Sequence, residues 1–124
     1  MTDRRSLGRA GELAAVRILE REGYRVLQTN FTTRYGEIDI VADEAGCLCF
    51  VEVRLKTGKE FGTAQESITR AKRHHLVRAA EIYLGQTGGQ DRECRFDVLA
   101  LLWDRETSAP RSHELIRNAF GADE

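Results

Sequence analysis

The segment GEIDIVADEAGCLCFVEVRLK, residues 36–56, decides the fold of this chain. Apolar and acidic side chains alternate over residues 36–42, and a mostly apolar run follows over residues 47–56. Both patterns are typical of β-strands. The polar, glycine-containing residues 43–46 between them predict a four-residue loop. The two strands are therefore expected to form an antiparallel hairpin.

The expected register of this hairpin gathers acidic side chains on one face. A four-residue loop pairs Ala42 with Cys47, and the same register places Glu37 opposite Glu52. Because successive side chains alternate, this face should carry a polar cluster far from the turn, made of Glu37, Asp39, Glu52 and Arg54. The opposite face of the first strand should carry Ile38 and Ile40. A loop one residue longer or shorter would separate the cluster, so the prediction depends on the register.

The three carboxylates of this cluster would repel one another unless a positive charge lies among them. A divalent cation with oxygen ligands, magnesium or manganese, is the usual partner of such a group. The alternative is a solvated face on which Glu37 and Glu52 pair with Arg54 or Lys56. The metal interpretation is favoured because the same face also carries apolar residues that indicate a covered surface, namely Val41, Leu48 and Phe50.

The rest of the chain predicts two helices and further strands around this hairpin. Residues 6–22 and 64–84 have helical patterns, and Gly23 and Gly85 are expected to end them. Strand patterns cover residues 24–31, 95–103 and 113–120, whereas a loop is expected over residues 57–62 and, around the single proline, over residues 107–112. The order is α-β-β-β-α-β with one further strand. Both faces of the strand at residues 47–56 are partly apolar, so an α/β fold with a central sheet covered on two sides is expected.

One charged residue interrupts the apolar stripe of each predicted helix. Glu12 lies within the apolar arc of the first helix, between Ala15 and Val16. An exposed glutamate near a helix start is also common because the helix dipole favours it, and this alternative stays open. Lys72 interrupts the stripe of the second helix, which consists of Ile68, Ala71, Leu76, Ala79 and Tyr83. Its ammonium is expected either to extend into water or to point into the carboxylate cluster.

Composition and charge restrict the class of protein and its partners. The 124 residues are 41% hydrophobic and 31% charged, which predicts a single globular domain over residues 1–124. With 19 Lys and Arg against 20 Asp and Glu, the net charge of −1 excludes a domain that is basic over its whole surface. Contacts with nucleic acid must therefore be local. The residues expected to contact phosphates are Arg54, Lys56, Lys59, Arg70, Arg73 and Arg78.

The sequence also restricts the cellular location of the protein and the class of reaction it could catalyse. The chain has no apolar run of transmembrane or signal-peptide length, and its three cysteines have no framework spacing, so a cytoplasmic protein with no membrane partner is expected. Carboxylates that hold a divalent cation beside a lysine suit hydrolysis of a phosphodiester. The chain contains no GxSxG, P-loop or GxGxxG motif, which argues against serine hydrolases and nucleotide-binding enzymes of those kinds.

A set of short motifs in order along nearly the whole chain carries a family resemblance. The motifs are Gly8-Arg9-Ala10-Gly11-Glu12 with Ala14, Gly23-Tyr24, Asn30-Phe31, Gly36-Glu37-Ile38-Asp39-Ile40-Val41, Phe50-Val51-Glu52-Val53-Arg54, Ser67-Ile68-Thr69 with Lys72, Arg95-Phe96-Asp97-Val98 and Asn118-Ala119-Phe120. In this combination the chain resembles the YraN-like family of small bacterial proteins. That family in turn resembles the PD-(D/E)xK nucleases, in particular the resolvase-like members, with a restriction-endonuclease-like αβββαβ core and a mixed central sheet flanked by helices.

The resemblance implies roles for individual residues. Asp39 matches the motif aspartate, Glu52 the acidic member of (D/E)xK, and Glu12 the first-helix glutamate, and these three would hold Mg²⁺ or Mn²⁺. Arg54 stands at the position of the motif lysine, and arginine is a permanent cation that clamps phosphate but is unsuited to proton transfer. Lys72 or Lys56 would then replace that lysine. Asp97 also matches a family position and is expected to be structural.

The implied function is metal-dependent cleavage of DNA, with branched or otherwise structured DNA as the expected substrate. Resolvase-like relatives often act as symmetric dimers, so a homodimer is an expected assembly. Two alternatives remain open: a nucleic-acid-binding domain that kept the fold without turnover, and a protein-interaction domain in which the acidic pocket has no role.

Overall fold

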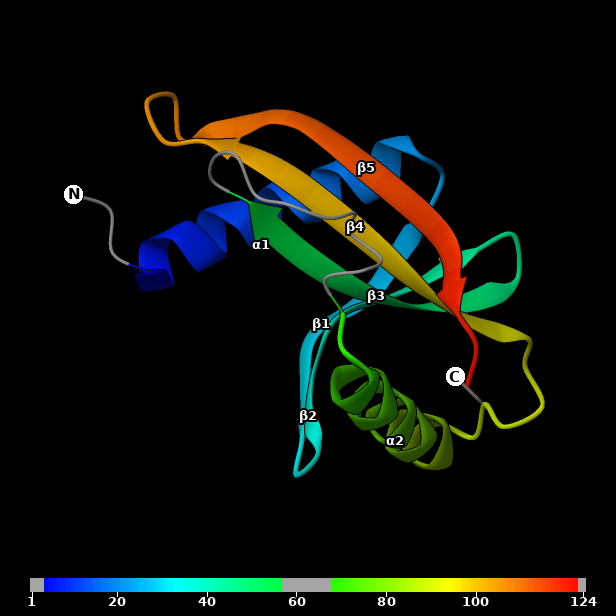
Figure 1. Cartoon of the computed structure of the whole chain (residues 1–124). Coiled ribbons are helices and arrows are strands. Elements are labelled where there is room, and N and C mark those ends of the chain that lie inside the picture. Colours follow the sequence, from blue (N-terminus) through cyan, green and yellow to red (C-terminus); the bar gives the residue numbers. More distant parts are fainter. Residues whose placement is uncertain (1–3, 57–67, 123–124) are drawn as a thin grey trace.

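The computed structural model describes residues 4–56 and 68–122, which form two helices and five strands (Figure 1). In chain order these are α1 (Arg4–Arg21), β1 (Arg25–Thr33), β2 (Gly36–Glu44), β3 (Cys47–Lys56), α2 (Arg70–Thr87), β4 (Cys94–Asp104) and β5 (Ala109–Phe120). The predicted α/β class and the predicted order of elements, including the additional last strand, are confirmed. No helix in the described parts of the chain is long and apolar enough to cross a membrane.

The strands form one mixed sheet in the order β1-β2-β3-β4-β5. Strands β3 and β4 are parallel, and the other neighbouring pairs are antiparallel. A parallel pair needs a crossover connection, and α2 lies within this one. The two helices cover opposite faces of the sheet, as the apolar character of both faces of β3 predicted (Figure 1).

A separate apolar cluster lies on each face of the sheet. Aromatic rings dominate the cluster under α2, where Phe50 and Tyr83 meet edge to face with centroids 5.8 Å apart. In the same cluster Phe96 stacks on Phe120 at 5.0 Å. The cluster under α1 is aliphatic and contains Ile18, Leu19, Ile40, Val51 and Leu99. Together the two clusters hold β3 rigidly at the centre of the sheet.

The turn between β2 and β3 is shorter than predicted. Ala45 and Gly46 form it alone, with φ angles of 53° and 89°, and Asp43 and Glu44 belong to the strand. Two consecutive left-handed residues are typical of the tight hairpin turn whose twist matches that of the flanking strands. Cys49, and not Cys47, therefore pairs with Ala42. The predicted register is wrong by two residues, which preserves the faces of the strands but changes which carboxylates lie opposite each other.

The outer half of the β1–β2 hairpin leaves the sheet and runs alongside α2 (Figure 1). Strand β2 pairs with β3 only as far as Ile40, which lies opposite Val51, whereas its pairing with β1 continues to Gly36. As a result Ile38 packs in the cluster under α2 and Ile40 in the cluster under α1. The prediction that these two isoleucines share one face is wrong, because the hairpin bends at the residue between them.

Helix α2 is displaced from its predicted bounds. It begins at Arg70 after the cap residue Thr69, whose side chain accepts a hydrogen bond from the backbone N–H of Lys72 at 3.1 Å. It continues through Gly85 and ends at Gly88, which adopts the left-handed conformation with φ 73°. Residues 64–67 of the predicted helix lie outside the described residues.

The structure corrects two further predictions made from the sequence. Ala71 of the predicted apolar stripe is exposed, and Ala80 is buried in the stripe instead. Strand β5 begins at Ala109, so Pro110 lies in an edge strand opposite Trp103 and not in a loop. An edge strand tolerates proline because one side of its backbone has no partner to bond. The predicted loop at residues 57–62 lies outside the described residues.

Candidate functional site

Asp39 lies where β2 separates from β3. The last backbone pair of the two strands is Ile40 and Val51, and beyond it the side chain of Asp39 takes over the role of a backbone acceptor. Its Oδ2 accepts a hydrogen bond from the backbone N–H of Val53 at 2.8 Å. The splaying of the hairpin thus opens a gap that the carboxylate fills. The shifted register also places Asp39, and not Glu37, level with Glu52.

Glu52 is the buried partner in this site. It lies on β3, on the face that α2 covers, and its side chain is only 4% exposed. The Lys72 Nζ, on α2, lies 3.3 Å from its Oε2, and the Nη1 of Arg54 lies 3.9 Å from the same oxygen. Among the described residues no donor makes a hydrogen bond of good geometry to this Oε2. A buried carboxylate oxygen that has charge compensation but no hydrogen bond is costly, and it is an available ligand.

The Asp39 and Glu52 carboxylates are electrostatically coupled. Burial raises the pKa of Asp39 to about 8, and the hydrogen bond and the negative charge of Glu52 add to the rise. The Val53 N–H and the charge of Lys72 oppose it. Near neutral pH Asp39 therefore retains its proton, because burial and the neighbouring carboxylate disfavour its charged form. A divalent cation could replace this proton.

Glu37 lies at the edge of the site. The hydroxyl of Thr32 donates to its Oε2 at 3.4 Å, and the residue is exposed. Its pKa is raised by partial burial, by the charge of Asp39 and, to a smaller extent, by the charge of Glu12. The prediction that Glu37 lies opposite Glu52 is corrected by the register, but Glu37 still lies within the electrostatic field of the other carboxylates.

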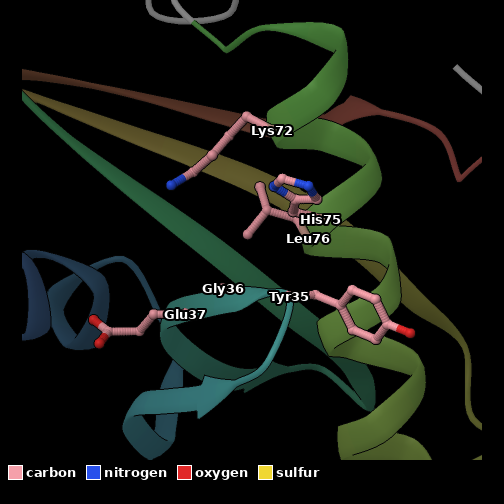
Figure 2. A pocket seen from close by; sticks show the side chains of 6 residues that line it. All are labelled: Tyr35, Gly36, Glu37, Lys72, His75 and Leu76. Atoms are coloured by element: carbon pink, nitrogen blue, oxygen red, sulfur yellow. The ribbon is translucent and has the colours of Figure 1, made fainter.

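A small pocket of about 70 Å³ adjoins the carboxylates between β2 and α2. Its lining residues are Tyr35, Gly36, Glu37, Lys72, His75 and Leu76. Figure 2 shows the Lys72, His75 and Leu76 side chains projecting from α2, with the Glu37 carboxylate, on β2, directed away from the helix. Gly36 has a φ of 137°, a conformation that side chains rarely adopt. The backbone at the start of β2 therefore favours glycine because of its positive φ.

Glu12, the third predicted metal ligand, is held by a different contact. Its Oε1 accepts a hydrogen bond from the Asn30 Nδ2, on β1, at 2.6 Å. Among the described residues no group of three or more His, Cys, Asp or Glu side chains is arranged to hold a metal ion. The structure thus brings Asp39 and Glu52 together, whereas the Glu12 carboxylate is bound to Asn30. Sequence reasoning did not assign a role to Asn30, although asparagine is unfavourable in the middle of a strand and could have signalled one.

The two adjacent carboxylates fit a divalent cation of the magnesium type. Magnesium in phosphoryl-transfer sites is usually held by one or two carboxylates, and water and substrate phosphate supply the remaining ligands. The Oε2 of Glu52, which accepts no hydrogen bond from any described donor, is the ligand such an ion would take first. Asp39 would follow on loss of its proton.

The described residues among those predicted to contact phosphate lie on β3 and α2. Arg54 is partly exposed on β3 beside Glu52, and Lys56 ends the same strand. Arg70 and Arg78 are exposed on α2, and Arg78 pairs with Glu81 at 3.6 Å. Arg73 has a structural contact, because its Nε donates to the Ile68 carbonyl at 3.2 Å and its guanidinium lies over the ring of Phe120. Lys59 lies outside the described residues.

A second polar cluster surrounds Asp97 on the α1 side of the sheet. Asp97 is completely buried and accepts hydrogen bonds from the Tyr24 hydroxyl at 2.7 Å, the Arg95 Nε at 2.9 Å and the Asn118 N–H at 2.9 Å. Burial and the hydrogen bond to Asp97 raise the pKa of Tyr24 well above its usual value. Because these donors satisfy the carboxylate, this cluster is structural.

The architecture and the acidic pair define a class of protein. The chain is an α/β protein with a mixed sheet, one helix on each face and acidic side chains where β2 splays from β3, an architecture compatible with a restriction-endonuclease-like core. The chain belongs to the family described as "Uncharacterised protein family UPF0102", whose sequence profile matches residues 11–101. This confirms the YraN-like resemblance.

Bacterial relatives match over almost their full length. The UPF0102 protein of Pelotomaculum thermopropionicum is 49% identical over 117 residues, which cover 94% of this chain and 97% of the relative. The UPF0102 protein of Moorella thermoacetica is 44% identical over 117 residues, with the same coverage of 94% and 97%. The UPF0102 protein of Desulfosudis oleivorans is 42% identical over 123 residues, 99% of this chain and 96% of the relative.

Proposed function

We propose that this protein is a metal-dependent nuclease that hydrolyses phosphodiester bonds in DNA, with branched or structured DNA as its expected substrate. The observation that carries the proposal is the pairing of the half-buried Asp39 with the buried Glu52, with the Lys72 ammonium 3.3 Å from Glu52. Two carboxylates that retain a proton beside a lysine form an electrostatically prepared site for a divalent cation and a phosphate.

Each residue of the pair has a distinct part in this proposal. Glu52 and Asp39 would hold Mg²⁺ or Mn²⁺, and the Val53 N–H would keep the Asp39 carboxylate in place. When bound, a divalent cation supplies activation of water and offsets negative charge on the phosphate. Lys72 would move its ammonium from Glu52 toward the scissile phosphate, because the cation would then satisfy Glu52.

Lys72 is the better candidate for the missing motif lysine. Its ammonium already lies against Glu52, and it extends from α2, the helix that packs on this face of the sheet. Lys56 lies two residues beyond Arg54 on β3. Replacing Lys72 and Lys56 separately would show which of these two lysines takes the part of the motif lysine. Arg54, whose charge is permanent, would clamp phosphate and would not transfer protons.

The basic residues of α2 and of the end of β3 would steer the DNA toward the carboxylates. They are Arg54, Lys56, Arg70, Arg73 and Arg78. Lys59, which is predicted to act with them, lies outside the residues that the structure describes. Because the net charge is only −1, the contacts with DNA should be local. The affinity for DNA should depend strongly on salt concentration. The homodimer and the cytoplasmic location stay predictions.

One observation favours a second candidate, a nucleic-acid-binding domain without turnover. Arginine stands at the motif lysine position, and Lys72 together with the proton that Asp39 retains already balances the carboxylate pair. Such a domain would bind DNA without a requirement for metal.

The test is cleavage of labelled linear duplex, single-stranded, flap and four-way-junction DNA with Mn²⁺, Mg²⁺ or a chelator. Cleavage should require the metal and should be lost in Asp39→Asn and Glu52→Gln, which preserve the shapes of the side chains. Glu20→Gln, on the exposed side of α1, is the matched control and should cleave normally. If neither metal binds or supports cleavage of any of these DNA forms, the nuclease proposal fails. A steep salt dependence of DNA binding would then favour the binding domain over the protein-interaction domain.

A further inference from the structure

The hairpin of β1 and β2 carries an arginine and a tyrosine at its tip. Arg34 and Tyr35 form the turn between the end of β1 and the start of β2. The Thr33 hydroxyl holds this turn, since it accepts the Tyr35 N–H at 3.1 Å and donates to the Gly36 carbonyl at 2.9 Å. Hydroxyl contacts of this kind fix the backbone of a turn. The two side chains at the tip are therefore presented on a fixed backbone.

Neither the turn nor the core accounts for the residue types at this tip. Hairpin turns of two residues favour glycine, asparagine and aspartate, because these tolerate a positive φ. Neither Arg34 nor Tyr35 has a positive φ. Arg34 is exposed, Tyr35 is half-buried, and the Tyr35 ring belongs to neither of the two apolar clusters described for the sheet. An aromatic ring in this setting is available to a partner.

The two side chains of the tip contact each other. The Arg34 Cζ lies over the Tyr35 ring, 5.0 Å from its centroid. A cation–π contact at an exposed site is weak, so the guanidinium can leave the ring at little cost. An aromatic ring next to a permanent planar cation suits a nucleotide, because the ring stacks on the base while the guanidinium binds the phosphate.

The tip lies beside the part of α2 that reaches the acidic pair. Tyr35 and Lys72 line the same pocket of about 70 Å³, to which Glu37 contributes a carboxylate. Figure 2 shows the Tyr35 ring beside α2, with its hydroxyl directed away from the Glu37 carboxylate. The Lys72 Nζ in turn lies 3.3 Å from the Glu52 Oε2. A nucleotide bound at the tip would therefore belong to a strand that also passes the acidic pair.

We propose that Tyr35 and Arg34 bind an unpaired nucleotide of single-stranded DNA, with the base stacked on the Tyr35 ring and the guanidinium of Arg34 on the adjoining phosphate. This inference rests on the proposed function and narrows its substrate to DNA that has a single-stranded segment beside the cleavage site. Bases of an intact duplex are already stacked on their neighbours and offer no free face. Every base has a stacking face, so this site would not select a sequence.

The test is binding of labelled single-stranded DNA and of blunt duplex DNA to the full chain, measured by fluorescence anisotropy in the presence of a chelator. Tyr35→Leu should weaken the binding of single-stranded DNA about 10-fold and that of duplex DNA less than about 2-fold. Tyr35→Phe keeps the ring and should bind both like the parent protein. Arg34→Ala should also weaken the binding of single-stranded DNA. Arg105→Ala, which removes an exposed arginine from the turn between β4 and β5, is the matched control and should have no effect.

A second measurement reports the stacking itself. A single 2-aminopurine in an oligothymidylate fluoresces strongly, because thymines stack weakly on it, and the emission falls when an aromatic ring covers the base. The parent protein and Tyr35→Phe should quench this emission, whereas Tyr35→Leu should not. A role of Tyr35 in folding alone would not produce this difference between the leucine and phenylalanine variants.

Several outcomes would overturn the role of Tyr35. They are unchanged binding of single-stranded DNA in Tyr35→Leu, equal losses for single-stranded and duplex DNA, unquenched 2-aminopurine in the parent complex, and a parent protein that does not bind single-stranded DNA. None of them depends on metal, so metal-dependent cleavage found alongside any of them would leave the nuclease proposal standing. Absence of cleavage would overturn the nuclease proposal alone, since stacking by Tyr35 would still be measured in the binding domain.

Discussion

The Lys72 ammonium on α2 lies 3.3 Å from the Glu52 Oε2 on β3, and this contact joins the helix to the central strand of the sheet. The Glu52 side chain is 4% exposed and the Lys72 side chain 43% exposed, so the carboxylate is buried while its counter-charge remains partly in water. The protein therefore keeps the Glu52 carboxylate in its interior beside a cation that stays partly in water.

Replacing Lys72 by Met should destabilise the protein, because the buried Glu52 carboxylate loses its nearest cation. We expect a loss of about 1–2 kcal/mol in the free energy of unfolding at pH 8, measured by urea titration in the presence of a chelator. Arg78→Met, which removes the exposed partner of Glu81, is the control and should cost less than about 0.5 kcal/mol. Equal losses in the two variants would contradict the importance of the Lys72–Glu52 contact.

The raised pKa of Asp39 predicts how stability depends on pH. The folded-state pKa of about 8 exceeds the ordinary value of 3.8, so folding favours the protonated form. This contribution to stability is complete below pH 3.8 and is lost as the pH rises through about 8. Without metal, the free energy of unfolding of the parent protein should fall between pH 5 and 9 more steeply than that of Asp39→Asn, which keeps an acceptor for the Val53 N–H. Parallel curves for the two proteins would show that Asp39 has an ordinary pKa.

Metal binding should depend on pH in the opposite direction. A divalent cation must displace the proton that Asp39 retains, so the affinity for Mn²⁺ should rise by up to about 10-fold per pH unit below pH 8 and level off above it. Calorimetric titrations at several pH values would measure this slope. A pH-independent affinity in the parent protein would mean that Asp39 does not bind the ion.

The N-terminal cap of α2 should influence the site through Lys72. The Thr69 side chain accepts the Lys72 N–H at 3.1 Å, so Thr69→Ala should cost about 1 kcal/mol of stability. Because the first turn of α2 then frays, the Lys72→Met substitution should have a smaller effect in the Thr69→Ala background, as measured by a double-mutant cycle. Thr69→Ser retains the acceptor and should behave like the parent protein. Additive losses would show that the cap does not position Lys72.

The sequence by itself determined the order of the elements, the bounds of β3 at Cys47–Lys56 and the covering of both faces of the sheet. These features follow from local periodicity, because the alternation of apolar side chains along a strand is a property of its own residues. The motifs of the chain also determined its family.

Only the tertiary structure decided which polar groups meet. The register depended on whether the turn took two residues or four, and the twist of the strands selected the shorter turn and placed Asp39 level with Glu52. The bend of the hairpin, the left-handed Asn30 and its bond to Glu12 accompany the packing of the hairpin against both helices. Periodicity assigns a side chain to a face, but the distance between two faces, or between two elements, depends on every residue that separates them.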